Sequence, residues 1–308
     1  MIIPLTGLQH EIEAGDYRAT VTELGAGLRE LAFHGQPVIA GHEADELPPA
    51  AAGQLLAPWP NRIDGGRYVF CGTEHQLALT EPAWGNAIHG LTRWIPWTAV
   101  GQDSSSVRLR CAPHGQQGYP FCLEIEAEYR LDPAAGLRVA VTARNRGSHA
   151  APYGTGSHPY LTVRTPSVDD CELVLPADSW LPADDRGIPS GPAEPVEGTE
   201  YDFRQPRSIG TTRLDHTLTG LSRDGEGRAW AHLAAAHGGP RVVLWADEGY
   251  RWLQVFTGDP LGPDRRRRAV AIEPMTCPPN AFVTADDLLV LEPGERVTHA
   301  WGIQAFAG

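Results

Sequence analysis

Hydrophobic and polar residues alternate with a period of two along many short segments of this chain. The clearest is Leu123–Leu131, and Leu137–Thr142 repeats the pattern after the turn-like segment Asp132–Gly136. Successive side chains of a strand point to opposite faces, so this pattern predicts a hairpin of half-buried strands. By the same pattern we expect strands at Tyr17–Glu23, Arg67–Phe70, Val107–Arg110, Arg241–Trp245, Arg251–Phe256 and Val297–Phe306.

Helical periodicity is almost absent. His42–Leu56 favours a short helix, interrupted at Pro48 and Pro49, and Asp215–Leu221 favours one helical turn. Because 34 Gly and 27 Pro residues fall at short intervals, the many short strands predict an all-β fold, a large antiparallel β-sandwich. Leu181–Gly198 is rich in Pro, Gly and acidic residues and is expected to be a surface loop. Strand patterning resumes beyond it, so we expect residues 1–308 to form a single domain.

Composition excludes several classes of function. The formal net charge is −13 and the sequence pI is near 5.3, which argues against nucleic acid or an anionic membrane as a partner. All 25 basic residues are arginine, so Schiff-base, pyridoxal phosphate and Walker-type phosphate chemistry, which need a lysine, are excluded. The five cysteines show no Cys-x-x-Cys spacing, which predicts neither a disulfide framework nor a zinc site.

The chain also lacks the patterns of secreted and membrane proteins. A secretory signal has a charged region followed by an apolar stretch. The first residues, Met1–Thr6, do not show this pattern. No apolar run approaches the about 18 residues of a membrane span. We therefore expect a cytoplasmic protein.

Two titratable residues each precede a proline. Glu273 follows the apolar run Ala269–Ile272 and precedes Pro274, and His158 precedes Pro159. A residue before proline is restricted to extended geometry, so each side chain should stand rigidly at the end of a strand. One carboxylate and one imidazole suffice for paired proton transfer at neutral pH. The alternative is that both are ordinary polar residues at strand ends.

Three further sites combine polar and structural residues. Asn61 and Arg62 follow a Pro-Trp-Pro stretch, and the planar fork of arginine suits hydroxyl or carboxylate recognition; Arg62 equally suits pairing with an acid that stabilises a turn. His89 precedes Gly90, which allows close approach of the backbone to a ligand, although a lone histidine is more often a buried structural group. Asp215 suits either sugar hydroxyls or, as the sequence alone favours, the cap of a helical turn.

Together these segments resemble the aldose 1-epimerase (mutarotase) family over nearly the whole chain, in order and rough spacing. The matching segments are Asn61-Arg62-Ile63 before a Gly-Gly turn, Ile88-His89-Gly90, Gly156-Ser157-His158-Pro159-Tyr160, Leu214-Asp215-His216 and Glu273-Pro274-Met275-Thr276. The resemblance implies the galactose mutarotase-like sandwich, with a pyranose bound on its concave face.

The resemblance also implies roles for individual residues. Glu273 is the implied general base that takes the proton of the anomeric hydroxyl, and His158 is the implied general acid that protonates the ring oxygen. The implied substrate-binding residues are Arg62, His89, Asp215, Asn61, Trp94 and Tyr160. Because mutarotation moves only protons, no cofactor or metal is expected. The expected partner is a monosaccharide, bound by a monomer or homodimer. Trp59, Trp94 and Tyr160 each suit either stacking on a sugar ring or the core, and for Trp59 the core is favoured.

Departures from the family pattern leave the sugar open. Galactose-specific members usually carry a glutamine two residues after the base and an aspartate where this chain has Asn280, so galactose does not follow as substrate. One alternative is a hexose-6-phosphate 1-epimerase, with the basic run Asp264–Arg268 as a phosphate site, although that run also suits a solvated loop. The others are a non-catalytic sugar-binding protein and a glycoside hydrolase or lyase that uses Asp215 with Glu273.

Overall fold

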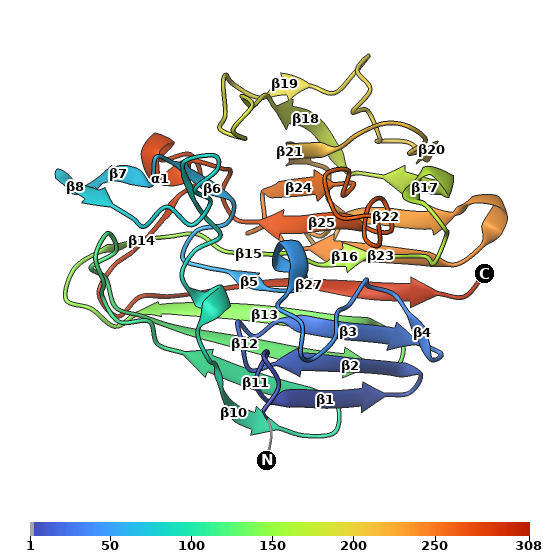
Figure 1. Cartoon of the computed structure of the whole chain (residues 1–308), viewed down its shortest axis with the longest axis horizontal. Coiled ribbons are helices and arrows are strands. Elements are labelled where there is room, and N and C mark those ends of the chain that lie inside the picture. The colour runs from blue at the N-terminus through green and yellow to red at the C-terminus, as the bar shows by residue number, and fades with distance from the viewer. Residues whose placement is uncertain (1–2) are drawn as a thin grey trace.

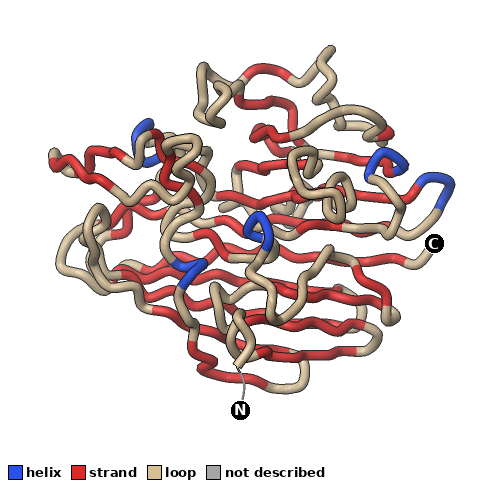
Figure 2. The backbone as a smooth tube through the Cα atoms, in the orientation of Figure 1, coloured by secondary structure: helices blue, strands red, loops and turns tan. Residues whose placement is uncertain are grey.

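The computed structural model describes residues 3–308, and of His237 only the backbone. Strands dominate, and helix is confined to short turns (Figure 2). These are α1 (Ala281–Thr284) and the 3₁₀ turns Pro49–Ala51, Thr92–Trp94, Val168–Asp170 and Ala236–Gly238. The expected all-β class is confirmed. Within the described residues, no helix has the length and apolar character needed to cross a membrane.

The largest sheet has nine antiparallel strands. Its order is β10 (Thr98–Gln102), β11 (Ser106–Cys111), β12 (Leu123–Asp132), β13 (Gly136–Asn145), β27 (Arg296–Phe306), β23 (Arg241–Ala246), β22 (Ala229–Ala235), β17 (Cys171–Val174) and β20 (Arg207–Ser208). The predicted hairpin is β12 and β13, paired from Leu123 opposite Asn145 to Asp132 opposite Gly136. Every second residue of β12 is buried, as the alternation requires.

An eight-stranded sheet carries most of the site described below. Its order is β19 (Glu194–Pro195), β18 (Ala177–Leu181), β21 (Asp215–Leu221), β24 (Trp252–Phe256), β25 (Val270–Met275), β15 (Gly156–Ser157) and β5 (Leu55–Leu56), with β16 (Tyr160–Leu161) also paired to β25. A four-stranded sheet has the order β1 (Gln9–Ala14), β2 (Tyr17–Thr22), β3 (Leu28–Phe33) and β4 (Gln36–Pro37). Three strand pairs complete the structure: β14 (Ala151–Tyr153) with β26 (Leu289–Leu291), β6 (Arg62–Asp64) with β9 (Asn86–Ile88), and β7 (Arg67–Phe70) with β8 (Thr73–Gln76).

The three large sheets share one hydrophobic core. Tyr129 and Val139 of the nine-stranded sheet pack in the same buried cluster as Val21 of the four-stranded sheet and Leu253 and Ile272 of the eight-stranded sheet. In Figure 1 the four-stranded and eight-stranded sheets lie across the nine-stranded one. Face-to-face packing of antiparallel sheets is the predicted sandwich.

Two predictions of helix are wrong. Within His42–Leu56 the only helical piece is the 3₁₀ turn Pro49–Ala51, because the two prolines remove the hydrogen bonds that a longer helix needs. Asp215–Leu221 is strand β21, so Asp215 caps no helix. Its β-branched Thr217 and Thr219 favour a strand, and pairing with β18 and β24 fixes it. The expected loop Leu181–Gly198 contains only the two-residue strand β19 beyond its first residue.

Candidate active site

Glu273 lies inside strand β25, not at its end as expected. On one side β25 pairs with β24, where Glu273 is opposite Gln254, and on the other it pairs with β15 and β16. The side chain of Glu273 is only 3% exposed. Ile272, its neighbour in sequence, faces the core, so alternation directs Glu273 to the opposite face of the sheet. Pairing on both sides of the strand fixes the position of the carboxyl group.

His158 occupies the break between β15 and β16. In β25 the backbone N–H groups of Ile272 and Thr276 donate to the carbonyls of Pro159 and Thr155, respectively. These two hydrogen bonds lie on either side of the break. Pro274 lies between these two donors and has no N–H, so β25 donates no bond at the level of His158. The backbone N–H of His158 instead donates to the carbonyl of Gln54 at 3.1 Å. The proline therefore accounts for the break from which the imidazole reaches the carboxyl group.

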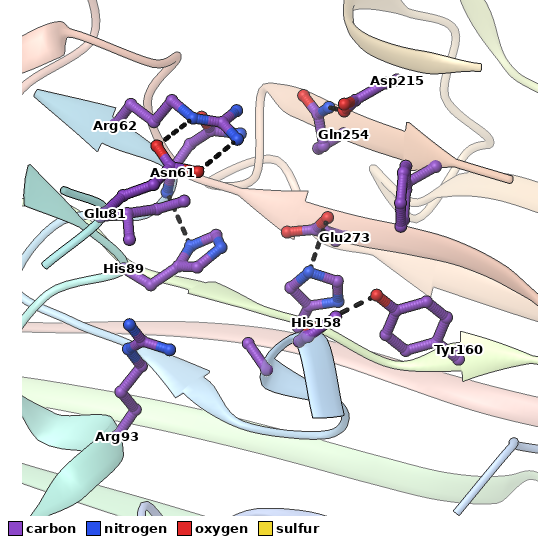
Figure 3. Close-up of a pocket in the computed structure, with 14 residues that line it drawn as sticks. Asn61, Arg62, Glu81, His89, Arg93, His158, Tyr160, Asp215, Gln254 and Glu273 are labelled. Carbon is purple, nitrogen blue, oxygen red and sulfur yellow. Dashed lines mark hydrogen bonds and ion pairs between the residues drawn. The ribbon is translucent and has the colours of Figure 1, made fainter. Parts of the chain in front are cut away.

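His158 and Glu273 form a buried pair. The Nε2 atom of His158 lies 3.2 Å from Oε1 of Glu273 (Figure 3). Burial raises the pKa of Glu273 well above its ordinary value, and the negative charge of Asp215 adds to this rise while Arg62 opposes it. Burial lowers the pKa of His158 from 6.5 to about 3, and the positive charge of Arg93 contributes. Burial therefore favours the neutral form of the pair, in which the shared proton is on Glu273.

Arg62 is clamped by a carboxylate that sequence reasoning missed. Its Nε and Nη2 atoms donate to the two carboxylate oxygens of Glu81 at 2.8 and 2.9 Å. The ring of Trp84 lies 5.1 Å from the guanidinium carbon. Arg62 is therefore paired with an acid, as one of the two interpretations of the sequence predicts. It also lines the cavity described below.

His89 is held in one tautomer by Asn61. The backbone N–H of Asn61 donates to Nδ1 of His89 at 3.2 Å, so the neutral ring carries its proton on Nε2. Burial lowers the pKa of His89 well below its ordinary value, and the charges of His158 and Arg93 act in the same direction. His89 is therefore a neutral hydrogen-bond donor. Both Asn61 and His89 have positive φ, 52° and 61°, a strained conformation that is common at functional sites.

Asp215 is oriented by a glutamine on the adjacent strand. Nε2 of Gln254 donates to Oδ1 of Asp215 at 2.7 Å, and the hydroxyl of Thr217 donates to Oε1 of Gln254. Asp215 thus presents a carboxylate that accepts hydrogen bonds at the same cavity as Glu273.

These side chains converge on one cavity of about 230 Å³. The lining residues are Ala50, Ala51, Asn61, Arg62, Glu81, Ile88, His89, Arg93, His158, Tyr160, Asp215, Gln254, Phe256 and Glu273. All the site residues predicted from the sequence line it except Trp94. Trp94 is 45% exposed and its ring packs beside the guanidinium of Arg93. Tyr160 stacks on His158 with ring centroids 4.9 Å apart, and Trp59 is buried against Tyr119 and Phe282.

The run of arginines after Asp264 does not line this cavity. Arg265 pairs with Glu46 at 2.8 Å, and Arg267 pairs with Asp169 and Asp259 at 2.6 and 2.9 Å. Arg268 donates to a backbone carbonyl, and Arg266 is exposed. The run therefore acts in the structure mainly to hold loops together. Within residues 3–308, no cluster of His, Cys, Asp or Glu has a geometry suited to a metal ion.

Sequence reasoning missed four polar or aromatic side chains of the cavity, Glu81, Arg93, Gln254 and Phe256. Glu81 carried a usable signal, because it precedes Pro82 just as Glu273 precedes Pro274. Gln254 and Phe256 lie two residues apart in a predicted strand and so share a face. Arg93 is adjacent to Trp94, and the resemblance implies Trp94 as the substrate-binding residue of this segment.

The comparisons with known proteins agree with this geometry. The family model for aldose 1-epimerase matches residues 9–304. The chain belongs to the aldose 1-epimerase family, whose members are enzymes that act on carbohydrates.

Individual relatives span most of the chain. The uncharacterized protein YihR of Escherichia coli (strain K12) is 37% identical over 290 residues, 94% of this chain and 91% of that protein. Human galactose mutarotase is 29% identical over 232 residues, 72% of this chain and 66% of the human protein. The crystal structure of a GalM/aldose epimerase homologue from C. elegans superimposes with a TM-score of 0.87 at 19% identity, covering 97% of this chain and 99% of that one, which supports the galactose mutarotase-like fold.

Proposed function

We propose that this protein is an aldose 1-epimerase that interconverts the α and β anomers of a hexose, with Glu273 as general base and His158 as general acid. The observation that carries the proposal is the 3.2 Å contact between the imidazole and the carboxyl group at the cavity. Family membership supports the reaction type, and the roles proposed for Glu273 and His158 are those that the resemblance implies for these positions.

The chemistry needs one proton shared between two groups. In the ionic form of the pair, Glu273 removes the proton of the anomeric hydroxyl while His158 donates a proton to the ring oxygen. The ring opens to the carbonyl compound, and the pair is left neutral, with the proton on Glu273. Rotation about C1–C2 and the reverse transfers close the ring as the other anomer. Each turnover thus returns the pair to its starting form, and each group contributes roughly 10²–10⁴ in rate.

The neutral form of the pair is the one that burial favours. Since ring opening converts the ionic pair into the neutral pair, the same desolvation that raises the pKa of Glu273 and lowers that of His158 assists the first proton transfers. The two side chains are buried together, so the effect applies to both ends of the transfer. This is a physical reason to bury both groups.

The rest of the cavity suits a sugar. Its volume of about 230 Å³ is below the about 300–1,000 Å³ typical of sites for drug-sized ligands. His89 offers an N–H donor and Asp215 a carboxylate acceptor, both of which suit hydroxyl groups. Tyr160, stacked on His158, adds an aromatic surface beside the proton donor.

Exchange NMR of the anomeric proton resonances, across freshly dissolved neutral and acidic hexoses, tests the proposal. The wild type is expected to accelerate exchange of at least one sugar. Glu273→Gln is expected to bind that sugar and to lose at least about 10²-fold in rate, whereas Glu292→Gln, an exposed carboxylate that does not line the cavity, is the matched control. Unchanged exchange in Glu273→Gln would support a non-catalytic sugar-binding protein instead. Acceleration of none of the sugars would refute the proposal.

A further inference from the structure

Arg93 is a cation without an anionic partner at the cavity among the described residues, and its guanidinium carbon lies 4.9 Å from the centre of the Trp94 ring. It lies in the 3₁₀ turn Thr92–Trp94 and lines the same space as His158 and Glu273. Within residues 3–308, its guanidinium has no carboxylate at ion-pair distance and donates no hydrogen bond, and its Nε atom is fully buried. Its backbone is fixed, because its carbonyl accepts from Nε2 of Gln54 at 2.8 Å. A half-buried guanidinium without a hydrogen-bond acceptor is unfavourable unless an anion joins it.

Arg93 is the lining cation that lacks a carboxylate at ion-pair distance among the described residues. Arg62 is matched by Glu81 through two hydrogen bonds. The pair of His158 and Glu273 is neutral when it holds one proton. Asp215 accepts from the neutral amide of Gln254 and keeps its negative charge, which acts on Glu273 and Arg62. Asp215 makes no ion pair with Arg93 and does not shift its pKa, so within residues 3–308 the guanidinium of Arg93 has no carboxylate bound to it.

Arg93 lies on the histidine side of the cavity. In Figure 3 it stands apart from Asp215 and Gln254, with the rings of His89 and His158 nearer to it. Its charge depresses the pKa of both histidines, whereas the charge of Asp215 acts on Glu273. Under the proposed function His158 serves the ring oxygen of the sugar. In a hexopyranose the carbon next to that oxygen, on the side away from C1, carries C6.

We propose that the hexose accepted by this site carries a singly charged acidic group at C6, and that Arg93 binds it. This inference rests on the proposed function and names its substrate class. The planar fork of arginine matches a carboxylate-type oxyanion, and one guanidinium balances one negative charge. A phosphate dianion needs a second cation, and the arginines at 265–268 that would offer one are outside the cavity lining.

Exchange NMR with matched sugars tests the inference. The sugars are glucose and galactose, the corresponding C6 acids glucuronate and galacturonate, and glucose 6-phosphate. The expected result for the wild type is a kcat/KM at least about tenfold higher for a C6 acid than for its neutral parent, since a hydrogen bond to a charged group contributes a factor of about 10 to 100. Arg93→Gln should lower the ratio of acid to neutral kcat/KM by about 10- to 100-fold, and Arg93→Lys should retain part of it. Arg266→Gln, the same charge change at an exposed site, should leave the ratio unchanged.

The outcomes separate the two proposals. Equal use of acidic and neutral hexoses, with a ratio that Arg93→Gln does not change, overturns the inference and leaves the epimerase proposal standing. Preference for glucose 6-phosphate overturns the inference that the group at C6 carries a single negative charge. If no sugar exchanges, the epimerase proposal falls, and thermal shift with glucuronate decides the inference: stabilisation that Arg93→Gln abolishes supports it, and no stabilisation overturns it.

Discussion

Gln254 lies directly across the ladder of β24 and β25 from Glu273, and its side-chain amide donates to Asp215. The amide orientation is set by Thr217, whose hydroxyl donates to Oε1 and so leaves the NH₂ group for Asp215. One strand pairing thus links the proposed base to a carboxylate proposed to bind hydroxyls. Gln254 is in this sense a positioning residue for the site.

Replacement of Gln254 by methionine, which keeps the volume and removes both hydrogen bonds, is expected to free Asp215 and weaken sugar binding. We expect KM to rise about 10-fold with a smaller change in kcat. Thr217→Val, which removes only the hydroxyl that orients the amide, is expected to have the same effect in weaker form. Initial rates of anomer exchange over a range of sugar concentrations measure both constants. A normal KM in Gln254→Met would contradict the role assigned to it.

The pH dependence of kcat/KM should follow the one-proton pair. Below about pH 3, the lowered pKa of His158, both groups are protonated and the base is lost. Above the raised pKa of Glu273 the pair holds no proton and the acid is lost. Between these limits the pair keeps one proton, so we expect no inflection near 6.5, the ordinary histidine value. Exchange rates measured from pH 4 to 9 check this, and a tenfold fall between pH 7 and 5.5 would contradict it.

Glu273→Gln should also stabilise the fold in a pH-dependent way. The folded pKa of Glu273 is raised above its ordinary value of 4.5, so its contribution to stability is present at low pH and is lost as pH rises towards the folded pKa. The difference in free energy of unfolding, variant minus wild type, should grow by about 1.4 kcal/mol per pH unit in that range. Urea denaturation at pH 5, 6 and 7 measures it. Parallel stability curves for the two proteins would rule out the raised pKa.

Gly90 should be intolerant of a side chain. Its φ is +69°, and a Cβ atom there would clash with the carbonyl oxygen of Ala57. Gly65 has φ +57° but open space around the corresponding position. Gly65→Ala should therefore cost only the backbone strain, about 1–2 kcal/mol, and Gly90→Ala about 2 kcal/mol more. Thermal unfolding of both variants compares them, and equal costs would show that the clash is relieved by a small shift.

The sequence allowed the class of fold to be predicted and drew attention to Glu273 and His158, the proposed proton-transfer pair, because both inferences depend on local patterns. Alternation marks strands, and proline marks Glu273 and His158 as rigid. The remaining cavity residues depend on pairings between distant segments. Gln254 lay in a predicted strand, yet only its register with β25 brings it opposite Glu273. In the Thr92–Trp94 turn, Arg93 lines the cavity and Trp94 does not, a difference that adjacent positions in a sequence do not reveal.

The position of His158 depends on two distant parts of the polypeptide, the loop at Gln54 that receives its N–H and the strand that carries Glu273. A ribosome must therefore release the chain beyond Met275 before the two groups can meet, and proteolysis that detaches β25 would separate them. Nascent or cleaved forms should thus be inert towards sugars even where most of the sandwich has already assembled.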